Sequence, residues 1–258
     1  MRFGFAASAP FGGEVLERLA PQHEIPFVLT QPDAPAGRGR GLRPAPAKLT
    51  ALRLGLPVIE RIEDVPDEPT IVLVAYGRLI PPGRLDRHLW LNVHPSLLPR
   101  WRGAAPVERA LMAGDAETGV TLIRLVEQLD AGPVAAQGAF TIAPEDDAGD
   151  VYDRATDLAV ELLERVLPEP SFEPQPGAGV TYAEKIGPED RVLDLSRPEE
   201  ALNRVRALSP HIGARTELNG RPVTVWRARL EGGRFVPVDV QPPGGRRMTY
   251  DEWLRGLR

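Results

Sequence analysis

The sequence predicts an α/β fold, with a mostly parallel Rossmann-like sheet domain followed by a small β-barrel-like domain of the OB type. Short apolar runs alternate with helical stretches over the first two thirds of the chain, which is typical of a parallel sheet covered by helices. A Pro- and Gly-rich stretch without periodicity then interrupts this pattern at 168–179. Short strands around turn signals follow it. We therefore predict an α/β domain at 1–167, a linker at 168–187 and a β-rich domain at 188–258.

The elements of the first domain follow from apolar periodicity and from flanking Pro and Gly. Residues 70–75 (TIVLVA) form an apolar run between Pro69 and Gly77, which favours a strand buried on both faces. Residues 151–167 repeat apolar side chains on one stripe and stop at Pro168, which predicts a helix. The other predicted elements are strands at 2–7, 25–30, 90–94 and 120–126, a helix at 14–19 and a helix that opens at 107–112.

The second domain carries one helical and several extended patterns. Residues 198–208 predict a helix. Strands at 223–230 and 234–241 flank Gly232-Gly233, which is a hairpin signal. A short helix at 250–257 is expected to close the chain.

Composition excludes several classes of function. The chain has 258 residues, 42% of them hydrophobic, and no cysteine, which excludes disulfides, thiolate metal sites and a cysteine nucleophile. Its four histidines are scattered, so we predict no metal site. The first turn, ASAPFGG, lacks the Gly-x-Gly-x-x-Gly pattern, which disfavours NAD or FAD. No apolar run approaches about 20 residues and no signal peptide is evident, so we expect a cytoplasmic protein away from membranes.

Basic residues gather in one segment of an otherwise acidic chain. The net charge is −5, yet residues 37–53 carry +5 and no acid. Such asymmetry favours a polyanionic partner. The cluster could also arise from composition, since 29 of the 31 basic residues are arginine. The basic residues of the segment are Arg38, Arg40, Arg43, Lys48 and Arg53.

The stretch 92–106 (NVHPSLLPRWRGAAP) carries the most informative residues. It follows a predicted strand, and open α/β sheets bind ligands at the carboxyl ends of their strands. Asn92 and His94 are two residues apart on that strand, so both side chains point to one face. Asp130 follows the next strand and offers a carboxylate, although it could be only a turn residue. Amide, imidazole and carboxylate together can support acyl transfer without a covalent intermediate.

The run NVHPSLLPRWRGAAPVERALMAGDAETGVTL resembles the 10-formyltetrahydrofolate-dependent formyltransferases, and the methionyl-tRNA formyltransferase family in particular. Two further stretches match that family, the basic segment TQPDAPAGRGR…PAPAK and the run TYAEKI at 181–186. Ala7-Ser8-Ala9-Pro10 departs from the usual Gly-Thr-Pro turn, and Pro95 stands where a small residue is usual. The C-terminal part is shorter than is typical of the family.

The resemblance implies that residues 1–167 are the catalytic domain and that the protein moves a formyl group to the α-amine of initiator methionyl-tRNA. The formyl donor would be 10-formyltetrahydrofolate, with no metal, and we expect a monomer. By resemblance, Asn92, His94 and Asp130 would be catalytic, Ser96, Leu97, Leu98 and Pro99 would contact the folate, and Arg38, Arg40, Arg43, Lys48 and Lys185 would bind tRNA. The shortened domain at 188–258 would also contact tRNA. Ser96–Pro99 could instead be only a strand end and a rigid turn.

Four other functions remain open from the sequence. A sugar-nucleotide N-formyltransferase would share the chemistry but should lack the basic Gly-Arg-Gly-Arg loop. A glycinamide ribonucleotide formyltransferase would need no second domain. A deformylating hydrolase would share the Asn-His-Asp set without the basic loop, and a catalytically silent RNA-binding module would not need the intact set.

Overall fold

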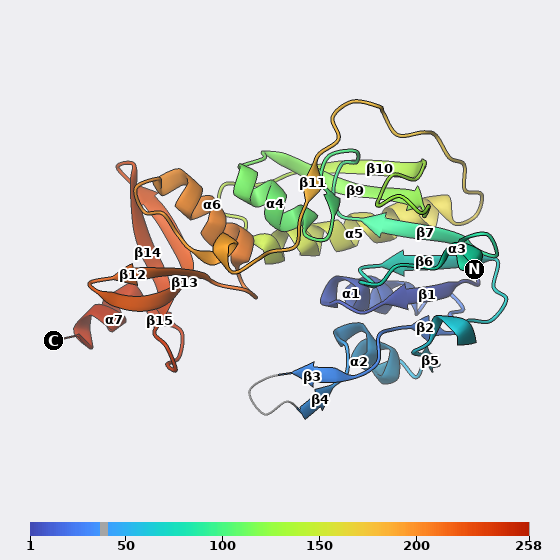
Figure 1. The fold of residues 1–258 in the computed structure, drawn as a ribbon, viewed down its shortest axis with the longest axis horizontal. Coiled ribbons are helices and arrows are strands. Elements are labelled where there is room, and N and C mark those ends of the chain that lie inside the picture. The colour runs from blue at the N-terminus through green and yellow to red at the C-terminus, as the bar shows by residue number, and fades with distance from the viewer. Residues whose placement is uncertain (37–40, 258) are drawn as a thin grey trace. The chain divides into compact units, whose positions relative to one another are not determined.

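The computed structural model of the chain describes residues 1–36 and 41–257. Its main feature is a seven-stranded sheet in the order β10-β9-β7-β6-β1-β2-β5 (Figure 1). The strands from β7 to β5 are parallel to one another, whereas β9 pairs antiparallel with β7. This confirms the predicted α/β class with a mostly parallel sheet. In sheet order the strands are β10 (Val134–Thr141), β9 (Glu117–Arg124), β7 (Leu89–His94), β6 (Thr70–Val74), β1 (Gly4–Ala7), β2 (Val28–Leu29) and β5 (Val58–Ile59).

Helices connect these strands, and proline opens most of them. In α1, α2, α3 and α4 a proline lies in the first turn, where its fixed φ suits the helix and its missing N–H costs nothing. The first helix begins earlier than the predicted 14–19, because Pro10 starts it and Gly12 and Gly13 are buried within it. The helices are α1 (Pro10–Leu19), α2 (Pro46–Arg53), α3 (Pro82–Leu85), α4 (Pro106–Ala113) and α5 (Ala148–Val166), with a 3-10 turn η1 at Ile62–Asp64.

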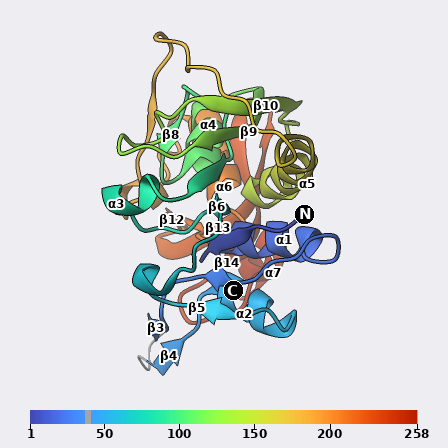
Figure 2. The ribbon, with the colours of Figure 1, turned by 90° about the vertical axis from the view of Figure 1, so that its right-hand side faces the viewer.

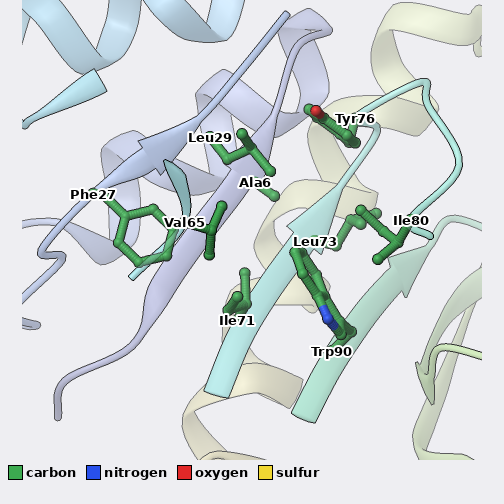
Figure 3. Packing of buried hydrophobic residues seen from close by; sticks show 9 residues of the cluster. All are labelled: Ala6, Phe27, Leu29, Val65, Ile71, Leu73, Tyr76, Ile80 and Trp90. Carbon is green, nitrogen blue, oxygen red and sulfur yellow. The ribbon is translucent and has the colours of Figure 1, made fainter. Parts of the chain in front are cut away.

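The two faces of the sheet bury different sets of side chains. A Cβ added to Gly12 of α1 would lie 2.5 Å from the Ala7 Cβ, so α1 packs closely on the face to which Ala7 points. Ala6 points to the opposite face, because side chains alternate along a strand. There it joins a buried cluster that includes Phe27, Leu73 and Trp90 (Figure 3). Trp90 and Asn92 point to the same face of β7, so this apolar cluster is adjacent to the polar residues at the end of that strand.

Helix α5 lies beside α1 (Figure 2), and polar contacts join them. Thr156 donates a hydrogen bond of 3.3 Å to Glu14, and Arg18 lies 3.5 Å from Asp157. His23, just after α1, lies 2.7 Å from Glu164 of α5. Among the described residues, no helix is both long and apolar enough to cross a membrane.

The chain divides into two compact units that are not contiguous in sequence. The first comprises 1–102, 119–139 and 154–181, and the second comprises 103–118, 140–153 and 182–258. Sequence periodicity could not reveal this, because the segments of each unit meet only through long-range packing. The predicted boundaries at 167 and 187 stay a prediction.

The second unit contains the predicted β-rich region. Strands β12 (Ala214–Leu218), β13 (Arg221–Glu231), β14 (Arg234–Gln241) and β15 (Met248–Thr249) form an antiparallel sheet in that order. Gly232 and Gly233 both have positive φ, of 55° and 75°, as the tight turn between β13 and β14 requires. Helices α6 (Pro198–Leu208) and α7 (Tyr250–Arg255) bury Val205 and Trp253 in the same cluster as Val225 and Val240.

The antiparallel, β-rich character of this region is therefore confirmed. In the part of the chain that the structure describes, its strands form a four-stranded sheet, in which β12 and β15 each have one neighbour.

Candidate active site

Asn92, His94 and Asp130 come together in the first unit. Asn92 and His94 end β7, and Asp130 lies in the turn after β9. The Asn92 Nδ2 atom donates to Asp130 Oδ1 at 3.3 Å, and His94 Nδ1 lies 3.6 Å from Asp130 Oδ2. All three residues are buried, with 6%, 4% and 8% of their surface exposed. Such a water-poor cluster of amide, imidazole and carboxylate strengthens electrostatic interactions with a bound substrate.

The main chain fixes the orientation of the His94 ring. His94 Nε2 lies 2.8 Å from the carbonyl oxygen of Trp101. A carbonyl only accepts hydrogen bonds, so Nε2 carries the hydrogen and Nδ1 faces the carboxylate of Asp130. Trp101 has φ of 64°, an uncommon backbone conformation for a non-glycine residue. The sequence motif did not reveal this contact, because it depends on a main-chain atom.

The turn that carries Asp130 has an uncommon backbone conformation. Asp130 has φ of 45°, which aspartate tolerates better than most residues. A Cβ at Gly132 would lie 1.7 Å from the carbonyl oxygen of Arg124, so the turn approaches β9 too closely for any side chain there. The Asp130-Ala131-Gly132 sequence therefore matches the shape that the turn requires.

The four predicted folate-contacting residues divide into two pairs. Ser96 and Leu98 are buried, at 0% and 3% exposure. The Ser96 hydroxyl donates to the Arg100 carbonyl oxygen at 2.7 Å, so it holds the turn from inside. Leu97 and Pro99 are half-buried. Any ligand of this turn therefore meets Leu97 and Pro99 first.

Thr121 holds the same turn, although no motif in the sequence indicates it. Thr121 on β9 faces His94 across the two strands and is fully buried. Its hydroxyl donates to the Ser96 carbonyl oxygen at 2.6 Å and accepts from the Leu98 amide at 3.1 Å. Gln137 of β10 donates to the Thr121 hydroxyl at 2.8 Å and to the Leu98 carbonyl oxygen at 3.0 Å. A buried threonine in a strand pattern gives no signal of this role.

Gln175, from the predicted linker, contacts the Asp130 turn. Its Nε2 atom donates to the carbonyl oxygens of Asp130 and Gly132, at 2.7 and 2.8 Å. An open hollow of about 510 Å³ lies beside this turn. Its lining residues are Arg102, Gln128, Ala131, Pro133, Pro174, Gln175, Pro176, Gly177 and Val180. The three buried polar residues of the site do not line this hollow.

The predicted tRNA-binding residues have different surroundings. Arg38 and Arg40 lie outside the described residues. Arg43 is exposed on β4 (Gly41–Arg43), which pairs antiparallel with β3 (Ala34–Ala36). The resemblance implies a basic loop in this segment, and the structure adds a short pair of strands on either side of residues 37–40.

Lys48 is less accessible than Arg43 and Lys185, the other predicted tRNA-binding residues that the structure describes. Its ammonium contacts Asp33, and it donates to Glu60 at 2.6 Å. Its side chain is only 16% exposed. Hydrogen bonds from Lys48 to Asp33 and to Glu60 raise the pKa of this ammonium. Lys48 therefore ties α2 to Asp33, which precedes β3, and to Glu60, which follows β5. A phosphate that bound Lys48 would have to compete with these two carboxylates.

Lys185 is exposed in the second unit, on a segment whose backbone is held by Arg109 of α4. Arg109 donates to the carbonyl oxygens of Glu184 and Lys185, at 3.1 and 3.4 Å. Its guanidinium also pairs with Asp190, at 2.7 Å from Nη1 to Oδ1 and 2.8 Å from Nη2 to Oδ2. The arginine thus links α4 to the TYAEKI segment.

Replacing Asp190 by asparagine is expected to lower the stability of the second unit. The hydrogen bond from Arg109, with a further one from the Gly187 amide, lowers the pKa of Asp190 in the folded protein. A carboxyl whose pKa is lowered by folding stabilises the fold above its unfolded pKa, about 3.9, and this contribution disappears as pH falls through the folded pKa. Asp190→Asn should therefore cost about 1–2 kcal/mol at pH 7, and this cost should decrease steadily as the pH falls below about 4.

Thermal melts of both proteins between pH 3 and pH 7 measure this difference. Glu217→Gln, at an exposed position of β12, is the matched control. A difference that did not shrink toward low pH would show that the ion pair is not its source.

Comparison with known proteins decides which family this site belongs to. Residues 7–167 match the formyl transferase family, and residues 185–236 match the C-terminal domain of formyl transferases. The chain belongs to the formyl transferase family. This confirms the resemblance drawn from the NVHPSLLP and TYAEKI runs.

Relatives in this family match nearly the whole chain. A "Methionyl-tRNA formyltransferase" of Dechloromonas aromatica is 38% identical, over 99% of this chain and 96% of the relative. The protein of that name from Ruegeria pomeroyi is 44% identical, over 93% and 85%. Among solved structures, "Methionyl-tRNA formyltransferase from Clostridium thermocellum" has a TM-score of 0.67, with 14% identity over 94% of this chain and 98% of that one.

Other solved structures share the formyltransferase fold. The N-formyltransferase of Helicobacter canadensis, in complex with folinic acid and dTDP-3-aminofucose, has a TM-score of 0.69 at 17% identity, over 89% of this chain and 87% of that one. At that identity the likeness concerns the fold alone. No group of three or more His, Asp or Glu residues that could hold a metal ion occurs in the described ranges.

Proposed function

We propose that this formyltransferase moves a formyl group from 10-formyltetrahydrofolate to the α-amine of initiator methionyl-tRNA. The product, N-formylmethionyl-tRNA, would serve translation initiation. The observation that carries the proposal is the buried contact of Asn92 and His94 with Asp130, in a chain whose full-length relatives bear the name methionyl-tRNA formyltransferase.

Asn92 would bind the oxygen of the formyl group. One N–H of its amide donates to Asp130, and a primary amide has a second N–H to donate. As the amine attacks the formyl carbon, negative charge develops on that oxygen. A fixed donor in a buried site stabilises this charge without reorganisation.

His94 would act mainly through its positive charge. Both neighbours of the ring, the Trp101 carbonyl at Nε2 and the Asp130 carboxylate at Nδ1, are hydrogen-bond acceptors. A ring that donates to both of them carries a hydrogen on each nitrogen and is therefore positively charged. The imidazolium then lies on the same strand face as Asn92 and stabilises the developing oxyanion electrostatically. This refines the sequence interpretation, because both ring nitrogens already have partners in the protein.

Asp130 would orient His94 and accept the proton that the attacking amine loses, directly or through water. That proton, relayed to N10 of tetrahydrofolate, allows the folate to leave as the formyl amide forms. The amine attacks the formyl carbon directly and N10 leaves as the new amide forms, so no covalent enzyme intermediate is required.

The folate would lie against the turn at Ser96–Pro99. Leu97 and Pro99 offer half-buried apolar surface, while Ser96, Leu98 and Thr121 hold the turn in shape. Apolar walls with a few polar anchors suit a conjugated ring system. A HypX structure from Aquifex aeolicus "in complex with Tetrahydrofolic acid" shares the fold, with a TM-score of 0.69 at 19% identity.

The proposal is tested by incubating the protein with 10-formyltetrahydrofolate and charged initiator tRNA and by measuring formylmethionine after deacylation. A dTDP-amino sugar serves as the alternative acceptor, since sugar N-formyltransferases share the fold. Turnover with tRNA supports the proposal. Turnover with the amino sugar alone would replace it by the sugar-nucleotide alternative.

The segment around β3 and β4 is expected to bind tRNA phosphates. Each phosphate contact contributes about 0.7–0.9 to the slope of log K against log salt. Replacing Arg38, Arg40 and Arg43 together by alanine should therefore flatten that slope by about two to three. The KM for tRNA should rise, while the KM for the folate should stay nearly unchanged.

Salt titration in a tRNA-binding assay measures this slope. Arg61→Ala is the matched control, because Arg61 is 70% exposed and lies outside the segment. Lys48→Gln should change the slope less than Arg43→Ala, since Asp33 and Glu60 already pair with Lys48. An unchanged slope in the triple variant would mean that the segment is only a solvated surface.

A further inference from the structure

Gln175 lies on the stretch of chain between α5 and β11 (Tyr182–Ala183), 45 residues beyond Asp130 in the sequence. Its side chain makes three hydrogen bonds. The amide nitrogen donates to the Asp130 and Gly132 carbonyl oxygens, and the amide oxygen accepts from Arg102 Nη2 at 2.6 Å. The Gln175 side chain thus joins the Asp130 turn to Arg102, the residue that follows Trp101.

The orientation of this amide is not ambiguous. Guanidinium groups only donate and carbonyl oxygens only accept, so the amide oxygen must face Arg102 and the nitrogen must face the turn. A flipped amide would lose all three bonds. Gln175 therefore braces the carbonyls on either side of Ala131 with both of its N–H groups.

This brace matters because the Asp130 backbone is held in an uncommon conformation. At φ of 45° a non-glycine residue needs support from its surroundings. The segment that carries Gln175 is itself held in place, because the main chains of Glu173 and Val134 exchange two N–H···O hydrogen bonds, of 2.7 and 2.9 Å. The carboxylate of Asp130 reaches Asn92 and His94 only while its own backbone stays in place.

We infer that Gln175 is a positioning residue for Asp130, and the inference rests on the proposed function of that carboxylate. Gln175 touches no reacting group. It fixes the turn whose carboxylate orients His94 and accepts the amine proton. A side chain from the predicted linker is thereby part of the catalytic apparatus.

The first test compares Gln175→Met with Glu173→Gln. Methionine has nearly the volume of glutamine but makes none of the three bonds, whereas the Glu173 side chain is exposed in the same stretch. For Gln175→Met we expect kcat to fall about 10- to 30-fold, with both KM values within about twofold, because orientation is lost and substrate binding is not. Glu173→Gln should leave both parameters unchanged. A rise in KM at unchanged kcat would overturn the inference.

The second test uses the background of Asp130→Asn. If Gln175 acts through the Asp130 carboxylate, Gln175→Met should lower the residual kcat of this variant by no more than about twofold. A further 10-fold loss in the double variant would mean that Gln175 acts independently of Asp130, which contradicts the inference.

A third measurement does not depend on the substrate. Hydrogen exchange of a peptide covering 126–134 should be at least about fivefold faster in Gln175→Met than in the wild-type protein, because the turn opens locally. Exchange in a peptide covering α6 should not change. Unaltered exchange at 126–134 would overturn the inference even if the wild-type protein formylates tRNA. If exchange is faster in the variant but the wild-type protein does not formylate tRNA, Gln175 still holds the Asp130 turn, and it is the proposed function that is contradicted.

Discussion

Replacing His94 by alanine is expected to lower kcat for formyl transfer by about 10²- to 10³-fold, the usual cost of removing one stabiliser of an oxyanion. The imidazole is buried between the Trp101 carbonyl and Asp130, so alanine removes the ring that the proposed mechanism uses and leaves the carboxylate without this partner. The strand itself should persist, because β7 is paired on both sides. Steady-state kinetics at saturating tRNA and folate measure the loss.

His88→Ala is the control for this variant. His88 is also buried, at 5% exposure, and immediately precedes β7, at the opposite end of that strand from His94. Its Nδ1 atom lies 2.7 Å from the Glu68 carbonyl oxygen, far from the candidate site along the strand. We expect His88→Ala to lower the melting temperature with kcat nearly unchanged. Near-normal turnover by His94→Ala would remove His94 from the mechanism.

Replacing Asp130 by asparagine is expected to lower kcat by about 10²- to 10⁴-fold, the range of general acid–base contributions. Asparagine also tolerates positive φ, so the turn at 130–132 should keep its shape and only the charge and the proton acceptor are lost. The dissociation constant for the folate should stay within about threefold. Single-turnover kinetics and calorimetric titration of tetrahydrofolate separate the two quantities.

Asp130→Gly completes this comparison, because glycine also accepts the backbone conformation and lacks any side chain. Both variants should be similarly slow if the carboxylate carries the effect. Loss of folate binding at unchanged kcat would instead make Asp130 an anchor for the folate.

Much of the α/β domain could be predicted from the sequence, and so could the strand that carries two of the candidate site residues. Asn92 and His94 could be placed on one face because β7 has a simple alternation ending at a Pro-containing turn. The resemblance to the formyltransferases is what joined Asp130 to them. For Asn92 and His94, local periodicity and the rule that loops meet at the carboxyl edge of a parallel sheet are enough. That rule does not apply to Asp130, because β9 is antiparallel to β7 and ends at the opposite edge of the sheet.

The supporting contacts could not be predicted in this way. Thr121 acts from a strand that is antiparallel to β7, and its register with His94 is a property of the folded sheet. Gln175 lies in a segment whose composition indicates only an extended linker. The ion pairs of Lys48 join residues 12 and 15 positions apart, and no pattern in the sequence distinguishes them from solvated charges.

The carbonyl of Trp101 has a practical consequence for how this site is probed. The group that fixes the ring of His94 belongs to the peptide backbone, so it is present whatever side chain occupies position 101. An alanine scan can delete the indole but leaves the acceptor of the hydrogen bond in the chain. A comparison of sequences does not show this contact either, because every residue type carries the same backbone carbonyl. Replacing the amide between Trp101 and Arg102 by an ester would weaken that acceptor while every residue identity stays the same.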